Sequence, residues 1–315
     1  MRGPATVYIP NLNGGHRLLS TLVSLHAQSI APRVVVVDNG SSDGSPDQAE
    51  DQFPDVSVVR LQSNQGFGRA LNRAVELHPA DLLVFLNNDI RCEPRFIEAL
   101  LEQAGNGAVA GVLLQAQDPG TIDSAGVVAD LTLLAFDYLH GEPVRAASGA
   151  PPPLGPTGGA ALVSLDAFRR VRGFDERIFA YLEDVDLAVR LRREGIECRL
   201  APDARAVHEH SATLGSGSAA KNALMGFSRG YLLRRYGVLR APRRGGRALV
   251  CEAVLCGGQM LIDHTTSGLA GRVRGWRAAG GLPRRALPDG ELLQLPLRDA
   301  LRARAKRRLE KQRPA

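Results

Sequence analysis

The feature that most constrains the fold is a regular alternation of strand and helix patterns between residues 6 and 114. Residues 34–37 are four consecutive valines, the pattern of a strand buried on both faces, whereas residues 66–77 repeat apolar side chains at helical spacing. Repeated β-α-β units with short links predict an α/β domain whose mostly parallel sheet carries helices on both faces. The other strands of this series are expected at 6–9, 56–61, 82–86 and 108–114, and the other helices at 16–28, from Ser45, and at 94–103.

Polar clusters follow the predicted strands at the positions where an open α/β sheet binds its ligands, beyond the carboxyl ends of the strands. Asp38 comes directly after the valine run and is placed to accept hydrogen bonds from a nucleobase or a ribose. Asp89, in the triplet Asn87-Asn88-Asp89, suits a divalent cation bound together with substrate phosphates. Asn, Gly, Ser and Asp also build ordinary turns, so each cluster taken alone fits a structural role equally well.

A second acidic cluster begins a predicted helix at residues 183–194. Its first turn carries Glu183, Asp184 and Asp186. Acidic side chains at a helix start are favourable against the helix dipole without any function, and Asp186 is spaced to pair with Arg190. The pattern alone therefore leaves a structural and a chemical interpretation open.

The segments around this helix are less regular. Residues 115–156 are interrupted by glycine and proline, which predicts loops or a hairpin. Two short strands are expected at 197–201 and 206–207, and His208 and His210 follow them. Two histidines separated by one residue, without further ligands nearby, are more often structural than metal-binding.

The formal net charge of +6 combines two unlike parts of the chain. Residues 240–315 contain 17 Lys and Arg against 6 Asp and Glu, a charge of +11, so residues 1–239 carry −5. We therefore expect a catalytic domain at 1–220 and a helical, basic C-terminal extension at 221–315.

Cysteine usage and hydropathy restrict the compartment. The four cysteines have no C-x-x-C spacing, which argues against a disulfide framework and a zinc site and favours a reducing compartment. We recognise no signal peptide, and no transmembrane helix is predicted, because the most apolar stretch, 248–262, is interrupted by Glu252 and by Gly257-Gly258. The expected location is cytoplasmic, with peripheral contact to the inner face of the membrane.

The basic extension has three interpretations. It fits a solvated tail. Nucleic acid binding is disfavoured, because no zinc finger, helix-turn-helix or aromatic RNA-binding motif accompanies the arginines and aromatic residues make up 5% of the chain. Leu, Val, Trp276 and Arg alternate within it, which favours contact with an anionic membrane surface.

Taken together, the motifs resemble one enzyme family. In order along the chain they are IPNLNGG, VVVVDNGSSDGS, NQGFGRALNRAV, LLVFLNNDI, GPTGGAALVSLDAF, GFDERIFAYLEDVDLAVRLRREG and HEHS. This series is similar to the family 2 glycosyltransferases of the GT-A fold, notably the branch of rhamnosyltransferases and related cell-wall or polysaccharide enzymes. The resemblance covers about residues 5–215, and its most specific part is GFDERIFAYLEDVDL.

The resemblance implies inverting transfer of a sugar from a dTDP-, UDP- or GDP-linked donor to a hydroxyl of a glycan, a lipid-linked molecule or a natural product. It assigns Asp38 to the base or nucleoside and Asn87 to the ribose. The further residues that it implies for substrate binding, in the first loop, the D-x-D-type triplet, the glycine pair and the acidic pair, are Pro10, Asn13, Asn88, Gly158, Gly159 and Glu183.

The same resemblance implies Asp184 as the catalytic base and a Mn²⁺ or Mg²⁺ ion held by Asp89 and His208. A carboxylate, an imidazole and diphosphate oxygens form a ligand set that slightly favours Mn²⁺. The loop 211–218 is expected to close over the diphosphate. Asn87 stands where many relatives have Asp, and because an amide adds no charge, metal binding leans on the other two ligands.

Three alternatives were weighed against this interpretation. A sugar-phosphate nucleotidyltransferase needs a G-x-G-T-R-L-type loop after the first strand, and residues 10–15 do not match it. A dinucleotide-dependent dehydrogenase lacks its G-x-G-x-x-G at the same place. A non-catalytic sugar-nucleotide-binding or scaffold protein of the same fold is disfavoured by the presence of Asp89, Asp184 and His208.

Overall fold

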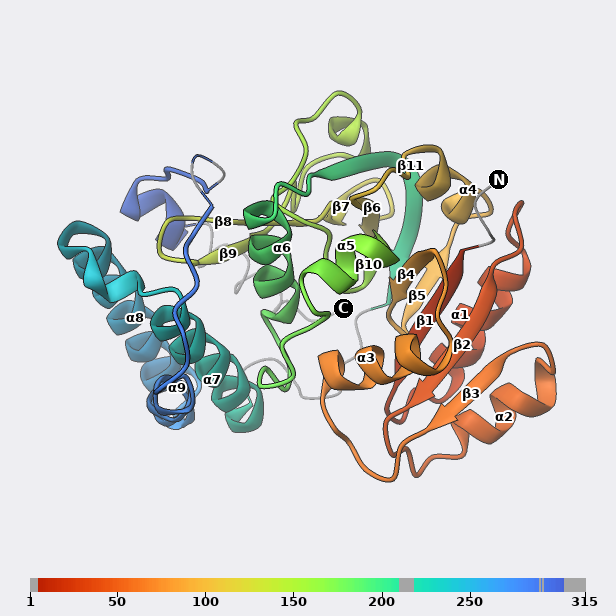
Figure 1. Ribbon diagram of the computed structural model, residues 1–315, viewed down its shortest axis with the longest axis horizontal. Helices are drawn as coiled ribbons and strands as arrows, with labels where there is room; N and C mark the ends of the chain where they lie inside the picture. Colours follow the sequence, from red (N-terminus) through yellow and green to blue (C-terminus); the bar gives the residue numbers. More distant parts are fainter. Residues whose placement is uncertain (1–4, 210–217, 289, 291, 303–315) are drawn as a thin grey trace.

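The computed structural model describes residues 5–209, 218–288, 290 and 292–302. Over these residues the chain forms a nine-stranded sheet (Figure 1). Eight strands follow the order β3-β2-β1-β4-β10-β6-β11-β5, and the ninth, β7, pairs with β6. The pairs β1–β2, β2–β3, β1–β4 and β6–β11 are parallel, which confirms the predicted mixed, mostly parallel α/β fold. The strands are β1 (Thr6–Asn11), β2 (Arg33–Asp38), β3 (Ser57–Arg60), β4 (Leu82–Leu86), β5 (Ile90–Cys92), β6 (Ala108–Gln115), β7 (Ile122–Ser124), β10 (Ala160–Ser164) and β11 (Cys198–His208).

Helices cover both faces of this sheet. Leu18, Ala49 and Phe96 bring α1, α2 and α4 into one core with the side chains of Val7 and Ile9. On the opposite face the apolar stripes of α3, α5 and α6 pack against residues such as Tyr8 and Val35. Successive side chains of a strand point to opposite faces, so the apolar residues in the middle of β1 and β2 supply both cores. The helices are α1 (His16–His26), α2 (Ser45–Gln52), α3 (Phe67–Leu77), α4 (Phe96–Glu102), α5 (Leu165–Arg170) and α6 (Glu183–Arg193).

Three parts of the sheet differ from the sequence-based expectation. Strand β10 inserts antiparallel between β4 and β6. Strand β11 is one long strand where two short ones were expected, with a register shift between Leu200 and Arg205. The irregular region 115–156 adds β7 to the sheet, which was not expected, and contains the 3-10 turn η1 (Val144–Ala147). The antiparallel hairpin of β8 (Val127–Ala129) and β9 (Ala135–Asp137) in the same region agrees with the expected loops or hairpin.

The C-terminal extension forms α7 (Ala219–Arg235), η2 (Val238–Arg240), α8 (Pro242–Ile262) and α9 (Ser267–Ala278), which gather on the side of the molecule away from β2 and β3 (Figure 1). Helices α7 and α9 approach at backbone distance. A Cβ at Gly226 would overlap the backbone of Gly268, and one at Gly275 would overlap the backbone of Phe227. Glycine at these positions therefore permits the close helix packing.

These helices share a hydrophobic core with the preceding α/β part of the chain. Val185 and Ala188 of α6 lie in one cluster with Tyr231 and Leu232 of α7. The division near residue 220 stays a prediction, because this cluster spans it.

Among the described residues one helix, α8, is long and apolar enough to cross a membrane by length and composition, with a mean hydropathy of 1.2 in its most apolar window. The sequence pattern had excluded such a segment because of Glu252 and Gly257-Gly258, but the helix continues through all three residues. Only 28% of that window is buried within the protein.

Candidate active site

The ends of β1 and β4 are joined by side-chain amides. Asn88 Nδ2 donates to Asn11 Oδ1 over 2.7 Å, and Asn11 Nδ2 donates to Ser45 Oγ over 3.1 Å. Gly14 lacks a side chain where a Cβ would meet both asparagines. The Asn88 side chain therefore links the carboxyl ends of β1 and β4. Its partner Asn11 was not among the predicted site residues.

The first two loops gather three of the predicted nucleoside residues. Pro10 pairs in register with Val37, one position before Asp38. Asp38 is buried, and its Oδ1 accepts a hydrogen bond from the Ser41 amide at 2.9 Å. Asn13 adopts a left-handed backbone with φ 52°, and its Oδ1 accepts from the Ser42 amide at 2.8 Å. One side-chain oxygen of Asp38 and the side-chain oxygen of Asn13 thus bind backbone amides of the second loop and stabilise its conformation.

The glycine pair lies between the strand-end asparagine and the acidic pair. The Gly158 amide donates to Asp184 Oδ2 over 3.2 Å. A Cβ at Gly159 would lie 3.1 Å from Asn87 Nδ2. The antiparallel register of β10, which places Ala160 opposite Leu86, creates this arrangement. Asn87, Gly158, Gly159 and Asp184 therefore lie close together.

The acidic pair follows a strained turn, since Tyr181 and Leu182 both have positive φ angles of 67° and 65°. Burial, reinforced by the charge of Asp184, raises the pKa of Glu183 to about 8. Burial also raises the pKa of Asp184, against the opposing effect of the Gly158 and Val185 amides. Glu183 is buried whereas Asp184 is half-buried, so Asp184 is the carboxylate with access to a bound molecule.

His208 lies between two carboxylates. Its Nε2 is 3.6 Å from Asp89 Oδ2, and its Nδ1 is 2.8 Å from Asp123 Oδ2. Burial lowers the pKa of His208, but the hydrogen bonds and charges of Asp123 and Asp89 outweigh it and raise the pKa to about 9. Asp123 is a buried residue of β7 that sequence reasoning missed, because it lies in the segment interpreted as loops.

These donors fit a hard divalent cation only together with substrate. No group of three or more His, Cys, Asp or Glu side chains with metal-binding geometry occurs in the part of the chain that the structure describes. Asp89 and His208 offer one carboxylate and one imidazole at a mutual distance of 3.6 Å. Carboxylate and imidazole are accepted ligands of Mn²⁺, and Mg²⁺ is commonly held by one or two carboxylates with substrate phosphates and water completing the shell.

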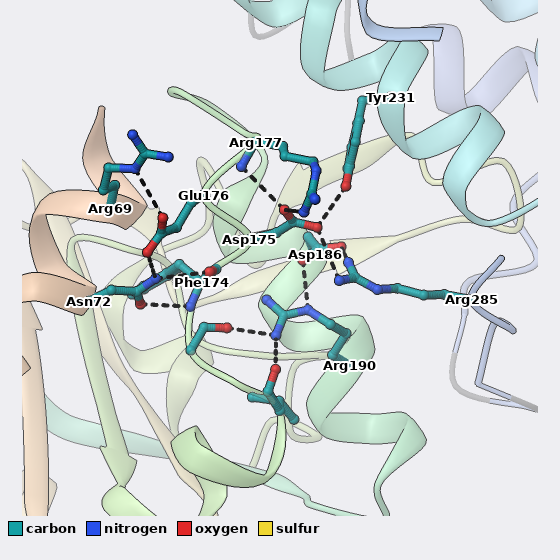
Figure 2. Close-up of polar contacts among 12 residues, drawn as sticks. Arg69, Asn72, Phe174, Asp175, Glu176, Arg177, Asp186, Arg190, Tyr231 and Arg285 are labelled. Atoms are coloured by element: carbon teal, nitrogen blue, oxygen red, sulfur yellow. Dashed lines mark hydrogen bonds and ion pairs between the residues drawn. The ribbon is translucent and has the colours of Figure 1, made fainter. Parts of the chain in front are cut away.

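The first turn of α6 is anchored to the C-terminal extension (Figure 2). Asp186 Oδ2 accepts from Arg190 Nε at 2.7 Å, as the i,i+4 spacing predicted, while its Oδ1 accepts from Arg285 at 2.7 Å and from the Tyr236 hydroxyl at 2.8 Å. Arg285 also lies 3.0 Å from Asp175. Partners up to 99 residues away gave no sequence pattern by which this network could be predicted. Both His210 and residues 211–217 of the expected lid fall outside the described residues.

Comparison with known proteins identifies the family of this chain. The pattern of Glycosyl transferase family 2 matches residues 6–171. The chain belongs to this family. It is 31% identical over 269 residues to an N-acetylglucosaminyl-diphospho-decaprenol L-rhamnosyltransferase from Mycobacterium tuberculosis, covering 76% of this chain and 86% of that protein.

Two further similarities bear on the family 2 assignment. The chain is 31% identical over 210 residues to an O-antigen biosynthesis protein from Myxococcus xanthus, covering 62% of this chain and 16% of that protein. The structure resembles that of a mannosyltransferase from Pyrobaculum calidifontis, solved with GDP-Man and Mn²⁺, with a TM-score of 0.53, 21% identity, and coverage of 98% of this chain and 81% of the other. The latter similarity supports the glycosyltransferase fold.

Proposed function

We propose that this family 2 glycosyltransferase transfers a sugar from a nucleoside-diphosphate donor to an acceptor hydroxyl with inversion, using Asp184 as general base. The observation that supports this proposal is the 3.2 Å contact between the Gly158 amide and Asp184 Oδ2, beside Gly159 and Asn87. It sets a carboxylate against the backbone segment that the family motif assigns to the donor sugar.

In the proposed reaction the Asp184 carboxylate takes the proton of the acceptor hydroxyl as its oxygen attacks the anomeric carbon. The bond between that oxygen and the carbon forms, and the bond between the carbon and the diphosphate oxygen breaks on the opposite face, so the configuration inverts. The raised pKa of Asp184, caused by burial, makes this carboxylate a stronger base than an exposed aspartate.

The donor nucleoside is proposed to bind across the carboxyl ends of β1, β2 and β4. Asp38 retains a carboxylate oxygen besides the one bonded to Ser41 and would accept from the base. Pro10 and Asn13 would border the same pocket, and Asn87 would hydrogen-bond the ribose.

A divalent ion, Mn²⁺ or Mg²⁺, would be held by Asp89 and His208 and would neutralise the departing diphosphate. Asp123 would act as a positioning residue, because its bond to His208 Nδ1 directs Nε2 towards Asp89. The mannosyltransferase of similar fold was solved with Mn²⁺, which supports this pairing.

The substrates are proposed from the mycobacterial relative. Its name describes rhamnosyl transfer to a diphospho-decaprenol-linked N-acetylglucosamine, and this chain covers 86% of it. We therefore propose a deoxyhexose donor and a lipid-linked acceptor, used at the cytoplasmic face of a membrane.

A donor panel tests the function. Purified protein is incubated with nucleoside diphosphates and their sugars, with and without Mn²⁺, and thermal stabilisation and sugar transfer are both measured. A matching donor should raise the melting temperature and be consumed when acceptor is added. Stabilisation without transfer to any lipid-linked or glycan acceptor would support the alternative, a non-catalytic sugar-nucleotide-binding protein.

A further inference from the structure

Helix α8 presents an apolar surface to the outside of the protein. All of its exposed residues from position 249 to 262 are apolar. Leu261 is 79% exposed, Leu249 58% and Val254 49%. We call this set the α8 face: Leu249, Val250, Ala253, Val254, Met260, Leu261 and Ile262. Contiguous exposed apolar surface marks an interaction site.

The polarity of α8 is the reverse of an ordinary surface helix. Its acidic residue Glu252 is buried, where it accepts from Arg229 Nε at 2.9 Å and from Arg272 Nε at 2.5 Å. Burial opposes ionisation of Glu252, but the charges of Arg229 and Arg272 outweigh it, and the pKa lies below its ordinary value. The carboxylate of the helix is therefore buried, whereas its exposed side chains between positions 249 and 262 are apolar.

Positive charge lies at the amino end of this surface and elsewhere on the C-terminal helices. Arg243, Val250, Val254 and Leu261 are spaced by seven, four and seven residues, which places them in one row along the helix. Arg243 is exposed at the amino end of that row. A cavity of about 500 Å³ in the same helical unit is lined by Arg234, Arg240 and Arg284, together with Ala279, Gly281 and Leu282.

We propose that the α8 face docks on a phospholipid bilayer that carries anionic headgroups, with α8 lying in the membrane interface. Apolar side chains would enter the acyl boundary while the arginines remain at headgroup level. A second copy of the chain is the less favourable occupant. Self-association through this face would bring together two copies of the segment 240–315, each with a net charge of +11.

The contacts of α8 favour docking over spanning. Arg247 Nη2 donates to Asp130 Oδ2 at 2.9 Å, which ties the amino half of the helix to the β8–β9 region. Glu252 is bound by arginines of α7 and α9. Moving α8 to the bilayer centre would break these ion pairs and leave charges in hydrocarbon, which is costly. This inference does not rest on the transfer chemistry, although a lipid-linked acceptor would make such docking useful.

A pair of fluorescent labels tests the contact directly. The four native cysteines are buried, so Val254→Cys and, as control, Val23→Cys on α1 can each be labelled with an environment-sensitive dye. Val23 is 58% exposed, which is similar to the 49% exposure of Val254. On vesicles with 30% phosphatidylglycerol, we expect a blue shift and quenching by brominated lipid at position 254 alone. No change at 254, or equal change at both positions, would overturn the proposal.

Charge and apolar substitutions separate the possible occupants. The double variant Val250→Glu/Val254→Glu should lower vesicle partitioning by about tenfold or more, whereas Val23→Glu should not. Salt should weaken binding to anionic vesicles, and carbonate should release the bound protein. If the double variant instead converts a dimer to a monomer and leaves vesicle binding unchanged, a second copy covers the face and the proposal is wrong. If detergent is required for release, α8 spans the membrane and docking is also wrong.

Discussion

The backbone amide of Gly158 donates a hydrogen bond to Oδ2 of Asp184 over 3.2 Å. This contact joins the segment that leads into β10 to the first turn of α6. Because β10 is fixed antiparallel to β4, the same segment reaches Asn87 at the end of β4. Sheet register therefore determines where the candidate base lies relative to the strand ends.

Replacing Asp184 by Asn tests the base. The amide keeps the shape of the side chain but cannot take a proton, so we expect transfer to fall by about 100- to 10,000-fold, with donor binding nearly unchanged. Initial rates and donor-induced thermal shifts measure the two effects. Asp166→Asn is the matched control, because Asp166 is an exposed acid in the first turn of α5. Full activity in Asp184→Asn would show that another group is the base.

The pH dependence of protein stability should report the ionisation of Glu183. Its pKa is raised to about 8 by burial and by the charge of Asp184, so the folded protein retains this proton more tightly than the unfolded chain. Stability should therefore fall as pH rises from the ordinary glutamate range towards about 8, and level off above it. Glu183→Gln should match the wild type in melting temperature at pH 4 and exceed it at pH 9.

The same variant distinguishes the two acids in the reaction. Near neutral pH Glu183 is proposed to be protonated, so Glu183→Gln should retain most of the transfer rate while Asp184→Asn does not. Transfer should decline as pH is lowered through the raised pKa of Asp184, since a general base must be ionised. Rate profiles from pH 4 to 10 provide the measurement. Equal loss in both variants would contradict the assignment of Asp184 alone.

Much of this site could be predicted from sequence because parallel strands deliver their carboxyl ends to one edge. The valine run identified Asp38, and the apolar run of β4 identified Asn87 to Asp89. The antiparallel insertion of β10 could not be predicted, because a buried apolar strand has no pattern that encodes its direction. The role of Asp123 was equally hidden, since its partner His208 lies 85 residues away.

Asp123→Asn should weaken metal binding without removing either proposed ligand. The bond to His208 Nδ1 would lose its charge, and such supporting partners commonly contribute 10- to 100-fold to metal affinity. Titration of Mn²⁺ by electron paramagnetic resonance measures this independently of transfer. Asp55→Asn is the control, because Asp55 forms a comparable pair with His26 at 3.0 Å on the surface. Unchanged Mn²⁺ affinity would remove the positioning role of Asp123.

Adding one methyl group at Gly159 should perturb donor binding more than folding. The new Cβ would lie 3.1 Å from Asn87 Nδ2, so the proposed ribose ligand must shift. We expect a loss of about 1 kcal/mol, or roughly fivefold in donor affinity, from such local overpacking. Gly246→Ala in α8 meets nothing within 4 Å and should leave affinity unchanged. An identical donor dissociation constant in both variants would show that Asn87 does not contact the donor.

Arg285→Gln should uncouple the C-terminal extension from the candidate site. Asp175 and Asp186 are both buried, and each would lose an ion-pair partner while remaining in place. Removing one member of a buried pair costs about 3 kcal/mol, which chemical denaturation can measure. Arg60→Gln, at the exposed pair with Asp47, should cost at most about 1 kcal/mol. Because Asp186 lies two residues from the candidate base, in the same turn of α6, transfer should also fall in Arg285→Gln at temperatures where the variant is folded. A destabilised variant with normal transfer would limit the network to a structural role.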